Sequence, residues 1–158
     1  MHQTSSESSF KTELIDLNDW HLPMNDEPHV PATGKYTQEH TKKWSQKITA
    51  ADGFIFVTPE YNHGYPAALK NALDHLFQEW GNKPAAVVSY GGSGGTKSAG
   101  QLKQVFELMQ MRLADTWPAI KLPRSVFETG KISDPNKDLM EYMKDVRTMA
   151  NQIANLLK

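Results

Sequence analysis

Short apolar runs, bounded by proline, glycine and polar residues, divide the chain into predicted strands. Phe54–Val57 and Pro84–Ser89 are almost wholly apolar, which is typical of strands covered on both faces of a sheet. Thr12–Leu17 and Asp115–Leu122 are also predicted strands, the second interrupted by Pro118.

Between these runs, apolar residues recur at the spacing of a helix. We expect loops at 18–34 and 123–137, and helices at Tyr36–Ala51, Pro66–Trp80, Ser98–Leu113 and Asp138–Leu157. Alternating strands and helices predict an α/β fold, a parallel sheet with helices on both faces. We expect a single domain over 1–158, in which the polar, serine-rich residues 1–11 form a disordered tail or a helix remnant.

Composition limits the classes of function that the chain can have. The net charge is −1 and no basic stripe occurs, so we expect no nucleic-acid partner. There is no cysteine, which excludes thiolate chemistry, and no apolar run reaches the roughly 20 residues of a membrane span. We expect a cytoplasmic protein without membrane partners. None of the six histidines stands at a recognised metal-ligand spacing, so we expect no metal site.

A polar and aromatic loop follows the first buried run. Thr58-Pro59-Glu60-Tyr61-Asn62 ends a predicted strand, and Pro66 opens a predicted helix. In parallel sheets, this carboxyl edge is where ligands bind. Backbone donors, a ring, an amide and a carboxylate suit a flat, partly polar ligand. The alternative is an ordinary turn, with Tyr61 packed and Asn62 bonded to its own backbone.

A glycine-rich loop follows the next buried run. In Ser89-Tyr90-Gly91-Gly92-Ser93-Gly94-Gly95, glycines let a ligand touch the backbone, although a ligand-free turn remains the alternative. Lys97-Ser98 suggests a phosphate loop, but Thr96 stands between Gly95 and Lys97 where that motif requires Gly-Lys. A nucleotide triphosphatase is therefore a minor hypothesis, tested by Lys97→Ala.

These segments resemble the NADPH-dependent FMN reductase family. The matching residues are Thr58–Asn62 and Leu69-Lys70-Asn71-Ala72-Leu73-Asp74, and the resemblance extends from Glu13–Leu17 to about Ala119. It implies a flavodoxin-like three-layer sandwich with a parallel sheet.

The resemblance also implies a function. It implies FMN as cofactor, NAD(P)H as co-substrate, and a small electron acceptor such as flavin, a quinone, an azo compound or a metal oxyanion. The flavin would do the chemistry, so no side chain need be catalytic. A homodimer or homotetramer is expected, with the helix that begins at Pro66 near the interface. The cofactor-binding residues that it implies are Pro59, Glu60, Tyr61, Asn62, Ser89, Tyr90, Gly91, Gly92 and Gly95.

The chain departs from the family before Thr12. Family members begin with a central strand and a Ser/Arg loop that holds the FMN phosphate, whereas here the first strand is missing. Three explanations stay open: a truncated protein, which we favour, direct pairing of the remaining strands, or a second subunit covering the gap. The alternative function is a truncated or degenerate flavodoxin-like protein with no FMN binding and no catalysis.

Overall fold

A parallel sheet forms the centre of the computed structural model, which describes residues 10–158. The strands are β1 (Phe54–Pro59), β2 (Pro84–Gly91), β3 (Arg112–Leu113) and β4 (Ala119–Lys121). β2 pairs with β1 along one side and with both β3 and β4 along the other. β2 is therefore the central strand. Its six successive residues 84–89 are buried, as its continuous apolar run predicts.

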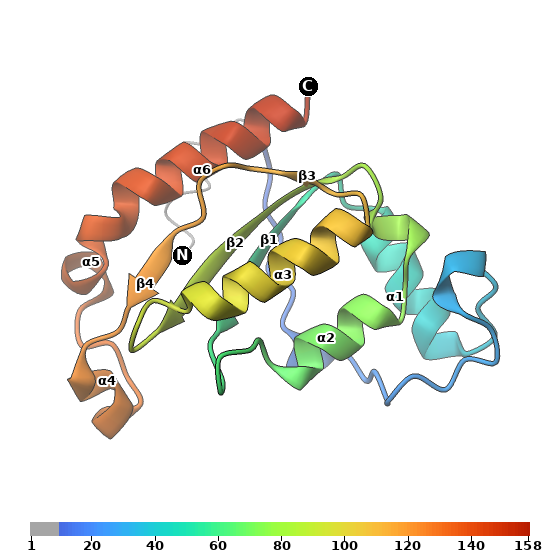
Figure 1. The fold of residues 1–158 in the computed structure, drawn as a ribbon, viewed down its shortest axis with the longest axis horizontal. Helices are drawn as coiled ribbons and strands as arrows, with labels where there is room; N and C mark the ends of the chain where they lie inside the picture. The colour runs from blue at the N-terminus through green and yellow to red at the C-terminus, as the bar shows by residue number, and fades with distance from the viewer. Residues whose placement is uncertain (1–9) are drawn as a thin grey trace.

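Helices cover both faces of the sheet (Figure 1). The α-helices are α1 (Glu39–Thr49), α2 (Ala67–Asp74), α3 (Thr96–Leu108), α4 (Arg124–Thr129), α5 (Pro135–Asp138) and α6 (Met143–Leu156). The 3₁₀ turns are η2 (Leu17–Asp19), η3 (Pro31–Thr33), η4 (Gln78–Trp80) and η5 (Met140–Tyr142). None of these described helices is long and apolar enough to cross a membrane.

Two hydrophobic clusters lie on opposite faces of β2. On one face, Val87 packs among residues of α1, α2 and α3, including Trp44 and Phe106. On the other face, Val88 packs against α6 through Met149 and its neighbours. The alternation along β2 thus produces a three-layer α/β sandwich of flavodoxin-like type, as predicted.

Several predicted boundaries are wrong. The helix expected from Pro66 begins one residue later, and it ends at Asp74 because the chain then turns into η4. The helix expected over Ser98–Leu113 stops at Leu108, since β3 begins at Arg112. The predicted 123–137 loop contains α4 and α5. These two helices are too short to show a clear apolar period.

The predicted strand at Thr12–Leu17 is wrong. This segment pairs with no strand among the described residues and leads into η2. Leu14 is 79% exposed, whereas Ile15 packs on the cluster of α1 and Phe10 on that of α6. Side-chain packing therefore holds this segment in place, and it makes no backbone hydrogen-bond ladder with a described strand. Direct pairing of this segment with β1, one of the explanations for the missing first strand, is ruled out. Residues 1–9 of the predicted tail lie outside the described residues.

Glu27 fastens the 22–30 loop to the start of α1. Its carboxylate accepts hydrogen bonds from the backbone N–H groups of Thr37 (2.7 Å) and Gln38 (2.9 Å), and from the Thr37 hydroxyl (2.9 Å). Burial opposes ionisation, but these hydrogen bonds outweigh it and lower the pKa of Glu27 from 4.5 to about 2. The charge also lies at the positive end of the helix dipole.

We predict that Glu27→Gln lowers stability in a pH-dependent way. The folded-state pKa of Glu27 is depressed, so its contribution is complete above about pH 4.5 and disappears as the pH falls towards 2. Allowing for solvent screening, the loss at pH 7 should be about 1 kcal/mol. Urea unfolding of both proteins at pH 7 and pH 3 measures this. An equal difference at both pH values would contradict the assignment.

Candidate functional site

The two loops singled out in the sequence meet at the carboxyl end of the sheet. Pro59 at the end of β1 pairs with Tyr90 of β2, and the N–H of Glu60 donates to the Tyr90 carbonyl at 3.1 Å. The loop after β1 and the loop from β2 to α3 therefore leave the sheet side by side (Figure 1). Adjacent parallel strands bring residues about 30 positions apart into one surface.

The first loop is a tight turn that presents Tyr61. Tyr61 and Gly64 exchange two backbone hydrogen bonds, of 2.8 and 2.9 Å, around Asn62 (φ 50°) and His63 (φ 67°). Two successive positive φ angles are typical of a type I′ turn, in which asparagine is favoured. Asn62 thus has a local structural role as well as its proposed one, and the Tyr61 side chain is left 63% exposed.

Glu60 joins the first loop to helix α3. Its Oε2 accepts from the backbone N–H of Lys97 at 3.1 Å and lies 3.5 Å from that of Ser98. The Ser98 hydroxyl in turn donates to the Pro59 carbonyl at 3.0 Å. A carboxylate therefore already occupies the first turn of α3, where a phosphate loop would hold its anion. This arrangement disfavours the triphosphatase hypothesis.

Two side chains of α3 hold the tip of the first loop. The Lys97 ammonium lies 3.0 and 3.1 Å from the ring nitrogens of His63, and the Gln101 amide donates to the His63 carbonyl at 2.9 Å. Lys97 is therefore engaged with a neighbouring loop rather than directed at the glycine-rich segment.

The second loop is fixed from within by Ser89 and Gly95. Ser89 is buried, and its hydroxyl donates to the Gly94 carbonyl at 2.7 Å. Gly95 has φ 71°, and a Cβ there would lie 2.8 Å from the backbone nitrogen of Tyr90. Only glycine fits so close to a strand in this conformation. Both residues shape the loop instead of lining its surface.

Gly92 and Ser93 form the open part of the second loop. Both are exposed, and their backbone N–H groups have no acceptor within residues 10–158. A Cβ placed on Gly92 would meet only the ring of Phe127, at 3.9 Å, and that ring on α4 is itself 62% exposed. Two free donors thus lie beside the exposed ring of Phe127.

Tyr90 packs on the cluster beneath α6. It is half-buried against the α6 cluster, and burial, with a smaller effect of Tyr61, raises the pKa of its hydroxyl. The phenol therefore stays neutral at physiological pH and is a hydrogen-bonding group rather than a base.

The sequence is similar to a family and to curated proteins that are named as reductases and oxidoreductases. Residues 1–121 match the profile of a family described as NADPH-dependent FMN reductase. The chain belongs to this family. It is similar to an NAD(P)H-dependent FMN reductase of Schizosaccharomyces pombe, with 49% identity over 154 residues that cover 96% of this chain and 76% of the relative. The FMN reductase resemblance inferred from the two loops is thereby confirmed.

Other relatives differ in their named acceptor. An NADPH:quinone oxidoreductase of Arabidopsis thaliana is 36% identical over 130 residues, which cover 77% of this chain and 64% of the relative. Among solved structures, the flavoenzyme NAD(P)H:(acceptor) oxidoreductase FerB of Paracoccus denitrificans has a TM-score of 0.71 at 22% identity. That match covers 98% of this chain and 84% of FerB, and it supports the flavodoxin-like fold.

The open surface fits one part of the family's cofactor. The isoalloxazine ring of FMN has flat faces and a polar edge that becomes electron-rich on reduction. The free N–H groups of Gly92 and Ser93 are donors for such an edge, and the absence of a Cβ on Gly92 permits close approach. Tyr61, in the loop that leaves the neighbouring strand, offers an exposed ring. Residues that fit the phosphate are not identified among 10–158.

The structure brings the sequence-predicted site residues together but divides their roles. Tyr61, Asn62 and Gly92 are exposed at the surface, and Gly91 lies next to Glu60, whose Cβ would be 3.8 Å from a Cβ on that glycine. The others hold the loops: Pro59, Glu60, Ser89, Tyr90 and Gly95. Their contact with cofactor stays a prediction.

The sequence does not predict the position of Phe127 beside the glycine-rich loop or the contact of Lys97 with His63. Phe127 lies in the segment predicted as loop, although Pro123 before it and Gly130 after it are boundary signals for a short helix. Lys97 was considered only as a phosphate ligand. Its contact with His63 joins residues 34 positions apart, which no local pattern reveals.

We predict that Gly95→Ala strongly destabilises the protein. The new Cβ would collide with the β2 backbone and hold alanine at φ 71°, so the loss should be about 2–4 kcal/mol. Gly100→Ala is the matched control, because a Cβ there meets nothing within 4 Å inside α3. Gly100→Ala should raise the free energy of unfolding by about 0.5–1 kcal/mol, because alanine is favoured over glycine inside a helix. Urea unfolding compares them, and similar values for both would refute the proposed packing.

Proposed function

We propose that this chain is an FMN-dependent NAD(P)H oxidoreductase that reduces small acceptors. The observation that supports this most is the exposed backbone of Gly92 and Ser93, in a loop that leaves the sheet next to the loop carrying the exposed Tyr61, at the paired ends of β1 and β2. Family membership supplies the cofactor, and the relatives named as FMN reductases agree with it.

The chain's own residues would bind and orient the cofactor. The N–H groups of Gly92 and Ser93 would donate to its polar edge, while Tyr61 and Phe127 would border its ring. Glu60 and Gly95 would keep the two loops at a fixed separation. When bound, FMN supplies two-electron transfer between NAD(P)H and the acceptor. No side chain is then required as acid or base.

We propose a quinone as the acceptor class, because the Arabidopsis relative carries that activity in its name. We further propose a cytoplasmic homodimer or homotetramer with α2 near the interface. The absence of cysteine agrees with a reducing compartment, and Ala67 and Ala68 at the start of α2 are exposed. Analytical ultracentrifugation measures the assembly, and a monomer at micromolar concentration would contradict this part of the proposal.

The proposed function predicts flavin binding and NAD(P)H oxidation. Titration of the purified chain with FMN should quench flavin fluorescence at one equivalent per chain. The loaded protein should be yellow and should oxidise NADPH in the presence of a simple benzoquinone. A protein that stays colourless at saturating FMN would instead support the alternative of a flavodoxin-like protein without cofactor.

We predict that Gly92→Val weakens FMN binding without unfolding the protein. A branched side chain would stand between the ligand and the free N–H groups, so the dissociation constant should rise at least about tenfold. Ala32→Val, at an exposed position in η3, is the control and should bind FMN normally. Unchanged FMN affinity in the Gly92 variant would show that the second loop does not border the cofactor.

A further inference from the structure

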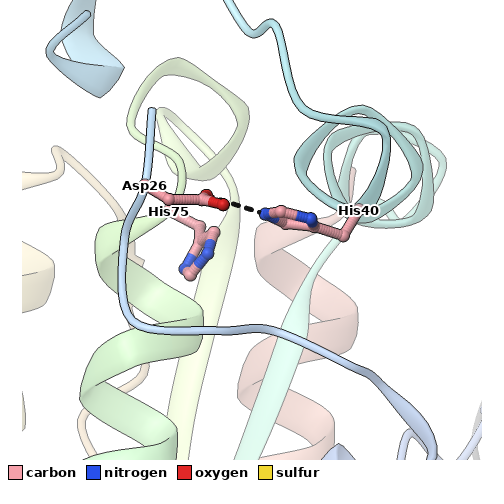
Figure 2. A group of neighbouring side chains, drawn as sticks. All are labelled: Asp26, His40 and His75. Atoms are coloured by element: carbon pink, nitrogen blue, oxygen red, sulfur yellow. Dashed lines mark hydrogen bonds and ion pairs between the residues drawn. The ribbon is translucent and has the colours of Figure 1, made fainter. Parts of the chain in front are cut away.

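Two histidines and one aspartate converge away from the flavin site. Asp26 comes from the loop before α1, His40 from the first turn of α1, and His75 from the position directly after α2 (Figure 2). One ligand atom from each lies within 4.8 Å of the others. Asp26 and His40 are 14 positions apart in the sequence, and His40 and His75 are 35 positions apart. This spacing matches no recognised metal-binding motif.

His75 offers a buried nitrogen that makes no hydrogen bond among the described residues. Its side chain is fully buried, and its Nε2 has no hydrogen-bond partner among residues 10–158. Its Nδ1 lies 2.8 Å from the Asn71 carbonyl, which can only accept, so Nδ1 carries the proton. In this tautomer the free lone pair is on Nε2. A backbone carbonyl that fixes the tautomer in this way is typical of metal-binding histidines.

Asp26 and His40 are also held in place. His40 Nε2 lies 3.0 Å from Asp26 Oδ1 (Figure 2). The neighbouring Glu27 is bonded to the backbone of Thr37 and Gln38, which fixes the loop that carries Asp26 against α1. The His40 and His75 rings have their centroids 5.9 Å apart. These contacts place the three groups before any ligand arrives.

We propose that Asp26, His40 and His75 form a binding site for a divalent transition-metal ion, with Zn²⁺ as the representative. Imidazole nitrogens suit zinc and its neighbours in the first transition row, whereas Mg²⁺ and Ca²⁺ prefer oxygen ligands. Two neutral histidines and one carboxylate leave a coordination position for water. The ion would displace the proton shared by His40 and Asp26 and satisfy the buried Nε2 of His75.

The geometry requires only a small adjustment. Ligand atoms of a tetrahedral zinc site are about 3.4 Å apart, and here all three lie within 4.8 Å of one another. The Asp26 and His40 side chains are 44% and 21% exposed, so both have room to move towards His75. The partial exposure of these two side chains gives an ion access from solvent, and a pocket of about 410 Å³, lined by Asp19, Trp20, His21, His40 and Lys43, lies beside His40.

Zinc binding to the full, untagged chain tests the site without any flavin. Isothermal titration with ZnCl₂ should give one equivalent per chain, and a parallel titration with MgCl₂ should give no heat of binding. In ¹⁵N spectra of the imidazole groups, Zn²⁺ should shift the Nε2 signals of His40 and His75. Failure of zinc to bind, or a shift confined to other histidines, would overturn the proposal.

His40→Gln and Asp26→Asn should each weaken Zn²⁺ binding at least about tenfold. Both side chains are partly exposed, so both variants should fold with unchanged circular dichroism in the presence of EDTA. His29→Gln, in the same loop but exposed and outside the cluster, is the matched control and should bind zinc normally. Equal losses in the His29 and His40 variants would show adventitious binding. The flavin site does not enter this test, so its outcome is independent of the proposed function.

Discussion

The Glu60 carboxylate determines how the two candidate loops lie with respect to each other. It extends from the end of β1 to the backbone N–H groups of Lys97 and Ser98 at the start of α3. Parallel pairing brings the strand ends together, and this contact fixes the base of the loop after β1 against the helix that follows β2, while Lys97 and Gln101 hold its tip. Hydrogen bonds to a charged group contribute roughly 1.5–3 kcal/mol each, less where solvent screens them.

The same contact limits what the site can bind. With a carboxylate at the start of α3, the helix dipole is already compensated, and a phosphate there would face like charge. What stays available is neutral donor chemistry, namely the free N–H groups of Gly92 and Ser93 near the Phe127 ring, with the exposed Tyr61 ring in the adjacent loop. This combination suits a flat heteroaromatic ring, which agrees with membership of the FMN reductase family.

The sequence predicts the centre of the molecule well and its periphery poorly. β1 and β2 follow from continuous apolar runs, and the two candidate loops follow from where those runs stop. Thr12–Leu17 has the composition of a strand, yet it pairs with no described strand, and composition carries no information about a partner. The Glu60 cap and the cluster of Asp26, His40 and His75 depend on contacts between residues far apart in sequence, so only the fold reveals them.

A crystal structure of the full chain soaked with FMN tests the central claim most directly. The account predicts electron density for the isoalloxazine ring against Tyr61 and the Gly92–Ser93 backbone, with the Glu60 carboxylate still bonded to the first turn of α3. A ring bound at another surface, or a Glu60 side chain that has left α3 to contact the flavin, would contradict it.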